Sequence, residues 1–242
     1  MAAQSGGLDK VHRLRTSNGK QSLAGSLPTG KRCAVVSNSG VLLNHKYGRD
    51  IDDADLVFRF NDAQVGSEFK EIVGERDDVR LVNGEFGQRV HDGRMHVKPG
   101  PEYVLFRAQP WQVDLANQVH IEHEEAHIVL GNDHLSDDSK KVLNRVFGAA
   151  PGLATSGFLG VGLAMTLCDE VRAYGFADTP GSASAPFHYF GDLRHGKANQ
   201  NNIHKLASRE KTFWRQVSTN NDVDQTDITV LPGTSQLNCT HA

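Results

Sequence analysis

Short apolar runs that alternate with helix-like segments constrain the fold of this chain more than any other sequence feature. Five runs are rich in β-branched and aromatic residues and stop at small polar residues: 33–40, 54–61, 79–83, 102–108 and 126–133. Helical patterns lie between and after them, at 114–117, 137–147, 156–168 and 208–218. This alternation predicts an α/β fold in which helices flank both faces of a mostly parallel sheet.

Length and charge narrow the classes of function. A chain of 242 residues can bury a sizeable core without metal or disulfide support, so we expect one domain over residues 31–242 after a flexible lead-in or stem remnant at 1–30. With 26 Lys and Arg against 29 Asp and Glu, and no basic block, neither nucleic acid nor a membrane surface is an expected partner. The longest apolar run, 158–168, is shorter than a membrane span of roughly 20 residues.

Polar residues at two predicted strand ends suggest a ligand site. Ser37, Asn38 and Ser39 follow the first strand, and Asn61 ends the second. The carboxyl ends of parallel strands bind ligands near a topological switch point, and short amides and hydroxyls can contact a phosphate or ribose there. We expect the loop at Asn132 and Asp133 on the same edge. A plain turn is the commoner outcome for such a loop.

A second candidate is the start of the apolar helix at 156–168. Thr155, Ser156 and Gly157 present hydroxyls and free N–H groups at a helix N-terminus, which favours an anion, although an ordinary N-cap is the alternative. His188 and His204 lie in polar segments and can serve as a general base or a phosphate ligand, but the chain has 12 histidines and most are expected at the surface.

The segment from His123 to His127 matches the zinc-binding HExxH pattern, with Glu124 as the base. That pattern requires a helix, and His127 runs directly into the strand-like Ile128, Val129 and Leu130. We therefore expect an acidic loop and a strand entry, with a zinc peptidase as the weaker alternative.

Together these segments resemble the eukaryotic-type sialyltransferases. Residues 33–83 are similar to that family's large sialylmotif, and 151–176, with the core TSGFLGVGLAMTLCDEV, to its small sialylmotif. Phe187, His188, Tyr189 and Phe190 resemble the third motif, and His204 with Glu210 resembles the very short fourth motif. Four motifs in the family's order make the resemblance specific.

The resemblance implies a Rossmann-like variant of the A-type nucleotide-sugar transferase fold and a glycosyltransferase that moves sialic acid from CMP-sialic acid to a glycan hydroxyl. The acceptor would be a terminal galactoside on a glycoprotein or glycolipid, and the transfer would invert the configuration and need neither metal nor cofactor. His204 would be the general base, and His188 and Tyr189 would hold the departing phosphate. Other substrate-binding residues would be Asn38, Ser39, Asn61, Thr155, Ser156, Gly157 and Phe176.

Three departures from the family pattern leave alternatives open. Five residues separate His204 from Glu210 where the family usually has four, which argues against Glu210 as the family's structural partner. Ala154 stands where relatives often carry Pro, and Gly191 stands where an acidic or amide residue is common. The donor could be a related CMP-activated 3-deoxy-2-ketulosonic acid, or the protein could be a non-catalytic CMP- or glycan-binding relative.

The resemblance also gives the cysteines a role. Relatives join the positions of Cys33 and Cys168, so it implies a disulfide and an oxidising compartment. The usual partner of Cys239 lies upstream of the first motif, where this chain has no cysteine. Because the family is normally anchored in the Golgi by an N-terminal helix, we expect a catalytic domain of the Golgi lumen without its anchor.

Overall fold

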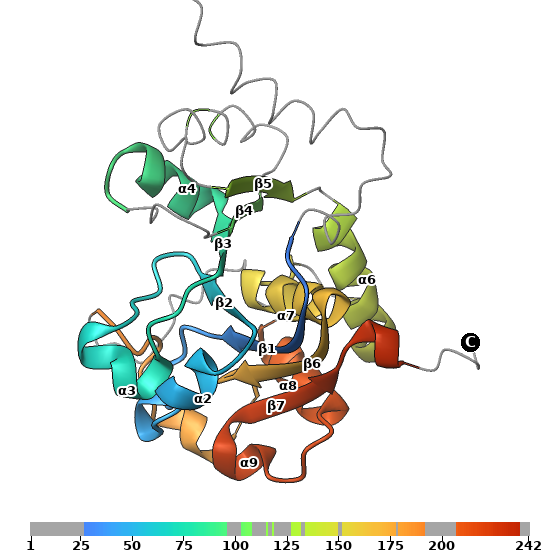
Figure 1. Ribbon diagram of the computed structural model, residues 1–242. Coiled ribbons are helices and arrows are strands. Elements are labelled where there is room, and N and C mark those ends of the chain that lie inside the picture. The colour runs from blue at the N-terminus through green and yellow to red at the C-terminus, as the bar shows by residue number, and fades with distance from the viewer. Residues whose placement is uncertain are drawn as a thin grey trace, which may run out of the picture.

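A single sheet organises the part of the chain that the structure describes. This computed structural model describes residues 27–95, 103–107, 115, 118, 127–131, 134–149, 152–177, 179–191 and 207–237. Seven strands among these residues form one sheet in the order β5-β4-β3-β2-β1-β6-β7 (Figure 1). They are β1 (Gly30–Val36), β2 (Leu56–Phe60), β3 (Val79–Asn83), β4 (Tyr103–Arg107), β5 (His127–Gly131), β6 (Cys168–Tyr174) and β7 (Ile228–Pro232).

The strand pairing confirms the predicted α/β class. β1 to β6 run parallel, and β7 alone pairs antiparallel, at the edge beside β6. All five predicted strands are present, β3 at its predicted bounds and the other four with shifted ends, whereas β6 and β7 are additional. The strand order reverses at β1, because β2 lies on one side of it and β6 on the other. This is the switch point at which such sheets bind ligands.

Helices and short 3-10 turns connect the strands. The predicted helices at 137–147, 156–168 and 208–218 correspond to α6, α7 and α8, whereas most of 114–117 lies outside the described residues. The helices are α2 (Gly48–Asp52), α3 (Lys70–Val73), α4 (Gly84–His91), α6 (His134–Phe147), α7 (Ser156–Leu167), α8 (Ala207–Val217) and α9 (Val223–Thr226). The 3-10 turns are η2 (Gly40–Asn44), η3 (Ser67–Phe69), η5 (Pro180–Ala183) and η7 (Thr234–Gln236).

Two hydrophobic cores cover the two faces of the sheet. Alternate residues of β1 point to opposite faces. Cys33 and Val35 join the core formed with α6, α7 and α8, whereas Ala34 and Val36 join the core formed with η2, α2 and α3. Residues from Cys33 to Val36 are all buried, as expected for a central parallel strand covered on both faces.

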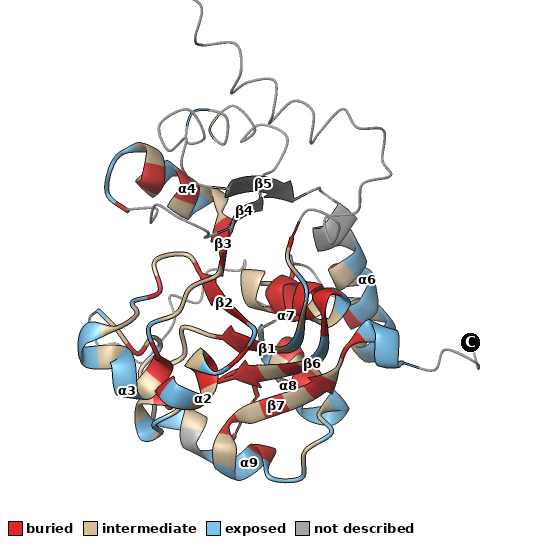
Figure 2. Ribbon diagram, in the orientation of Figure 1, coloured by how far each residue is buried: buried red, intermediate tan, exposed pale blue. Residues whose placement is uncertain are grey.

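Helix α7 is the most deeply buried helix in Figure 2. Thr155 caps it, and apolar side chains surround it on most faces, as predicted. Gly160 allows close contact with β2, since a Cβ at that position would lie 2.5 Å from two ring atoms of Phe60. Gly162, one half-turn further on, has no atom within 4 Å of the same position.

These two glycines give a matched pair of variants. Gly160→Ala should lower the free energy of unfolding by about 1–3 kcal/mol, because the added methyl group overpacks the Phe60 ring. Gly162→Ala should raise it by about 0.5–1 kcal/mol, because alanine favours the helix and meets open space. Chemical denaturation of both variants measures the difference. Equal effects would contradict the close contact between α7 and β2.

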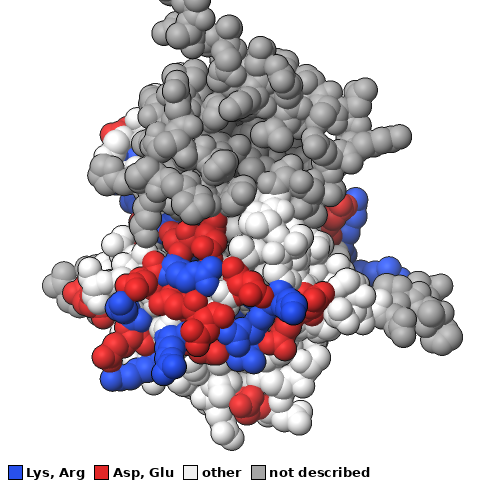
Figure 3. Space-filling view, in the orientation of Figure 1, with Lys and Arg blue, Asp and Glu red and all other residues white. Residues whose placement is uncertain are grey.

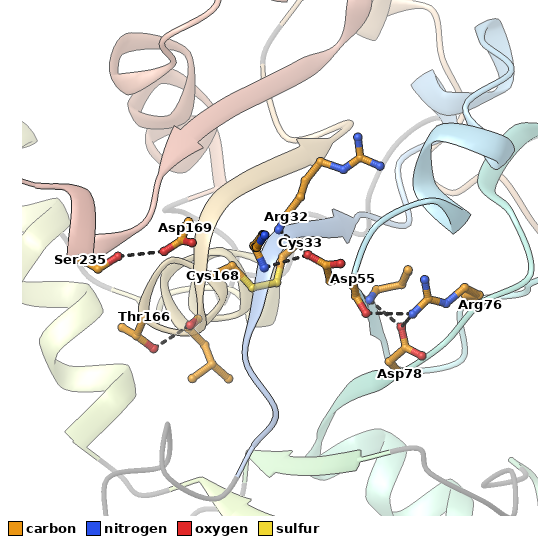
Figure 4. Close-up of a disulfide and its surroundings, with 12 residues drawn as sticks. Arg32, Cys33, Asp55, Arg76, Asp78, Thr166, Cys168, Asp169 and Ser235 are labelled. Atoms are coloured by element: carbon orange, nitrogen blue, oxygen red, sulfur yellow. Dashed lines mark hydrogen bonds and ion pairs between the residues drawn. A yellow bond between two sulfur atoms is a disulfide. The ribbon is translucent and has the colours of Figure 1, made fainter.

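A disulfide joins Cys33 of β1 to Cys168, the first residue of β6, as the family resemblance implied (Figure 4). The two Cα atoms are 6.0 Å apart, and 135 positions separate the cysteines in the sequence. In the chain-entropy model, closing a loop of this size stabilises the fold by about 5 kcal/mol. The bond links the middle of β1 to the start of β6, the two neighbouring strands at the switch point.

The surface around α2 and α3 carries interleaved charges of both signs (Figure 3). Lys46 pairs with Glu71 and Lys70 with Glu75, and Arg172 pairs with Asp50. This face therefore presents no block of one charge. Among the described residues, no helix combines the length and the apolar character that a membrane span requires.

Candidate functional site

The predicted site residues converge where the parallel strands end. β1, β2, β3 and β6 run in the same direction, so the turns that follow them lie at one edge of the sheet. Ser37 follows β1, Asn61 follows β2, Asn83 ends β3 and Gly175 follows β6. The structure thus brings the residues of the first motif next to the end of the second.

The loop from Ser37 to Ser39 is tied to the end of β6. The backbone N–H of Ser37 donates to the Tyr174 carbonyl at 3.1 Å, and its hydroxyl donates to the Gly175 carbonyl at 3.1 Å. The hydroxyl oxygen also accepts from the Ser39 N–H at 3.1 Å. Side chain and backbone together fix the course of this loop across the switch point.

Asn38 carries the most informative polar group of the loop. Its Nδ2 donates to the Phe60 carbonyl at 3.4 Å, which links the ends of β1 and β2. Its Oδ1 is buried and has no hydrogen-bond partner among the described residues. A buried acceptor without a partner costs about 1–3 kcal/mol, so this position favours a ligand that supplies a donor group.

Asn61 lies in a strained turn that the neighbouring strand supports. Its φ of 50° is in the left-handed region, and its Oδ1 accepts from the Asn83 N–H at 3.1 Å. The Asn61 carbonyl accepts from the guanidinium of Arg80 at 2.6 Å, and that buried guanidinium also pairs with Asp77. Sequence reasoning singled out neither Asn83 nor Arg80. The signal for Asn83 was present, since it ends a strand as Asn61 does.

His188 lies directly against the Ser37–Ser39 loop. Its neighbour Tyr189 donates a backbone N–H to the Asn38 carbonyl at 3.0 Å, and His188 itself forms an isolated bridge with Ser39. The imidazole stacks between Phe187 and Phe190, with ring centroids 4.4 and 5.2 Å away. Burial lowers the pKa of His188 below its ordinary value of 6.5, and Asp62 opposes this more weakly. The ring is therefore a neutral hydrogen-bonding group at neutral pH.

This environment makes the stability of the fold depend on pH through His188. As the pH falls through 6.5, the unfolded chain binds the proton before the folded chain does, so stability is lost until the lower folded pKa is passed. His188→Gln should therefore lose less stability than the wild type between about pH 7.5 and pH 5.5. Denaturation at both pH values measures this, and His91→Gln controls for the loss of one histidine. An unchanged pH dependence in His188→Gln would contradict the buried imidazole.

The N-terminus of α7 already holds an anion, the carboxylate of Glu210 on α8. Glu210 is 5% exposed, and its Oε1 accepts from the Thr155 N–H at 2.8 Å. Its Oε2 accepts from the Thr155 hydroxyl at 2.6 Å, and that hydroxyl accepts from the Phe158 N–H at 3.1 Å. The spacing argument against Glu210 as a structural partner was wrong, because the carboxylate meets the small motif directly.

A double-mutant cycle tests this contact. Thr155→Val and Glu210→Gln should each lower the free energy of unfolding, and their effects should couple by about 1–2 kcal/mol, as expected for a charge-assisted hydrogen bond. Thr166→Val is the matched control, since its hydroxyl donates only to the Leu163 carbonyl within the same helix at 2.7 Å. Paired with Glu210→Gln, it should give additive effects. Additivity in the Thr155 cycle as well would refute the contact.

Three predicted substrate-binding side chains are engaged by the fold itself. The Thr155 hydroxyl is shared between Glu210 and the helix, and Tyr189 is fully buried with its hydroxyl donating to the Gln64 carbonyl at 2.6 Å. Phe176 is buried against Phe60, and its ring lies 2.8 Å from the position of a Cβ on Gly157. These residues therefore help to hold the loops of the site in place, and their contacts with a substrate stay a prediction.

Several predicted residues lie outside the described part of the chain. His204 is one, and so are Asn132, Asp133 and the pair His123 and Glu124. His127 opens strand β5, so the second histidine of the HExxH pattern does not lie on the helix that a zinc site of this type needs. Within the described ranges, no three His, Cys, Asp or Glu residues form a cluster suited to a metal ion.

Comparison with known proteins decides the family. A model of glycosyltransferase family 29 (sialyltransferase) matches residues 8–130 and 109–221. The chain belongs to this family. It is 28% identical over 203 residues to type 2 lactosamine alpha-2,3-sialyltransferase of Mus musculus, covering 74% of this chain and 60% of that protein. It is 27% identical over 210 residues to CMP-N-acetylneuraminate-beta-1,4-galactoside alpha-2,3-sialyltransferase of Rattus norvegicus, covering 77% and 55%.

This family 29 chain thus spans 55–60% of the length of these two curated relatives. Two crystal structures share its fold. A mammalian sialyltransferase, 19% identical, superposes with a TM-score of 0.52 over 86% of this chain and 84% of that one. A mammalian sialyltransferase in complex with Gal-beta-1-3GalNAc-ortho-nitrophenol, 21% identical, gives 0.53 over 86% and 79%.

Proposed function

We propose that this protein transfers sialic acid from CMP-sialic acid to a hydroxyl of a glycan, with a terminal galactoside as the acceptor. The observation that carries the proposal is the family 29 match, which spans both strands of the switch point and the loops that follow them. The names of the curated relatives support a CMP-linked donor and a galactoside acceptor for those proteins.

The proposed reaction is an inverting displacement at the anomeric carbon of sialic acid. The acceptor oxygen forms a bond to that carbon while the bond to the phosphate oxygen of CMP breaks, and the acceptor hydroxyl loses its proton. His204 accepts this proton as general base, an assignment that rests on the fourth motif. Because CMP is a good leaving group, the protein's main tasks are to place the hydroxyl opposite it and to stabilise the departing phosphate.

The loops at the carboxyl edge fit the donor side of this reaction. Oδ1 of Asn38 can accept from a hydroxyl or amino group of the nucleotide, and His188 lies beside it with a ring able to donate to the phosphate. The N–H groups of Ser156 and Gly157 begin α7 next to the N–H that Glu210 occupies, and they favour negative charge. We propose that metal is not required and that the Cys33–Cys168 bridge reflects an oxidising, Golgi-type lumen.

A transfer assay tests the proposal. Purified protein with CMP-sialic acid and galactosylated acceptors should form sialylated product in the presence of EDTA, and NMR of the product should show inversion. His204→Ala should lower kcat by about 10²–10⁴-fold, the usual contribution of a general base. His91→Gln, on α4, should retain activity as the control.

The other outcomes separate the alternatives. Full activity in His204→Ala would refute the base assignment. Tight CMP binding without transfer would indicate a non-catalytic relative. Transfer only from a different CMP-linked 3-deoxy-2-ketulosonic acid would change the donor while leaving the reaction class intact.

A further inference from the structure

A buried carboxylate outside the motifs contacts both sides of the donor-side loop. Asp227 precedes β7 and is 4% exposed. Its Oδ2 lies 2.7 Å from Nε2 of His45, and its Oδ1 accepts from the Thr179 hydroxyl. A carboxylate withdrawn from water is costly unless such partners hold it, so the arrangement is specific and not an incidental surface pair.

The backbone of Asp227 reaches the same loop from the other side. Its carbonyl accepts from the Gly175 N–H at 2.8 Å, and the Gly175 carbonyl accepts from the Ser37 hydroxyl. Gly175 has a φ of 73°, and a Cβ there would lie 2.6 Å from the Ser37 oxygen. The contact between the end of β6 and the Ser37–Ser39 loop therefore requires glycine at position 175. The hydrogen bond from Gly175 to the Asp227 carbonyl keeps this glycine in place.

His45 anchors the far side of the loop. Turn η2 begins directly after Ser39 and ends at Asn44, and His45 caps it by donating its N–H to the Leu42 carbonyl at 3.1 Å. Tyr47 stacks on the imidazole at 4.8 Å, and its hydroxyl donates to the Thr226 carbonyl. Burial raises the pKa of Tyr47 to about 12, so this hydroxyl keeps its proton. Asp227 thus contacts Gly175, whose carbonyl holds Ser37 at the start of the loop, and His45, which lies just after the loop and turn η2.

We propose that Asp227 is a positioning residue for the Ser37–Ser39 loop, and that His45 and Thr179 keep its carboxylate in place. The inference rests on the proposed function, since it assigns this loop to the CMP moiety of the donor. Breaking the contacts of the Asp227 carboxylate with His45 and Thr179, which we call the clamp, lets the loop move, so donor binding weakens and the KM for the acceptor changes little.

The test uses the whole chain and four variants. Asp227→Asn keeps the size of the side chain and suits the left-handed φ of 52° at this position. His45→Phe keeps the stack on Tyr47 but removes the hydrogen bond, whereas His45→Gln restores a donor. Asp78→Asn is the matched control, because its Oδ2 accepts from the Val57 N–H at 2.8 Å at the opposite edge of the sheet.

Asp227→Asn and His45→Phe should raise the Kd for CMP, measured by calorimetry, and the KM for CMP-sialic acid by about five- to tenfold, as expected for one lost buried contact. The acceptor KM should stay within about twofold. His45→Gln should recover most of the affinity, and Asp78→Asn should bind CMP as the wild type does. Hydrogen exchange should quicken in the peptide 37–44 for Asp227→Asn and not for Asp78→Asn.

Two results would overturn the inference: unchanged CMP affinity in Asp227→Asn and His45→Phe, or an equal loss in Asp78→Asn, which would indicate general destabilisation. If the wild type neither binds CMP nor transfers sialic acid, the proposed function fails. Hydrogen exchange then tests separately whether Asp227 holds the loop. An unchanged exchange rate in the peptide 37–44 of Asp227→Asn would refute that role.

Discussion

The structure depends on the pairing of β1 with parallel strands on both sides. β2 and the strands beyond it lie on one side of β1, and β6 with β7 lies on the other, so the two halves of the chain meet at this strand. The Cys33–Cys168 disulfide links the middle of β1 to the start of β6. At the carboxyl end of β1, the Ser37–Ser39 loop leaves the sheet beside Gly175, and this proximity brings the first and second motifs together at the candidate site.

The charge available to a ligand at the site depends on which buried charged side chains already have partners within the protein. Glu210 occupies the N–H of Thr155 and therefore uses part of the positive field of the α7 N-terminus. Arg80 is held by Asp77 and by the carbonyls of Asn61 and Ala63. Within the part of the chain that the structure describes, the groups left for a bound phosphate are the remaining N–H groups and His188, whose neutral ring can donate a hydrogen bond without the cost of burying another cation.

Local sequence patterns predicted the helices and strands that are specified by their own residues and the residues next to them. β3 was found at its exact bounds because Val79–Asn83 is a compact β-branched run, and α7 because Thr155 caps an apolar segment. β6 was missed since it starts directly after Leu167 with no Gly or Pro between helix and strand. β7 was missed because its short sequence, Ile-Thr-Val-Leu-Pro, shows no alternation of apolar and polar residues and ends in proline, although its burial alternates. Glu210 was misjudged for a different reason, since its partner lies 55 positions away and sequence spacing from His204 carries no such information.

Several motif residues hold the loops of the site in place, whatever contacts they also make with a ligand. Tyr189, Thr155 and Phe176 do so, and Asp227 does the same outside the motifs. A loop with no regular hydrogen bonding of its own stays in one conformation only when neighbouring elements satisfy its backbone. Transfer by displacement gains from such rigidity, because dipoles that are already oriented toward a departing phosphate need no reorganisation as charge develops. The contacts beneath the site are therefore as much a condition for the proposed chemistry as the groups that would touch the donor.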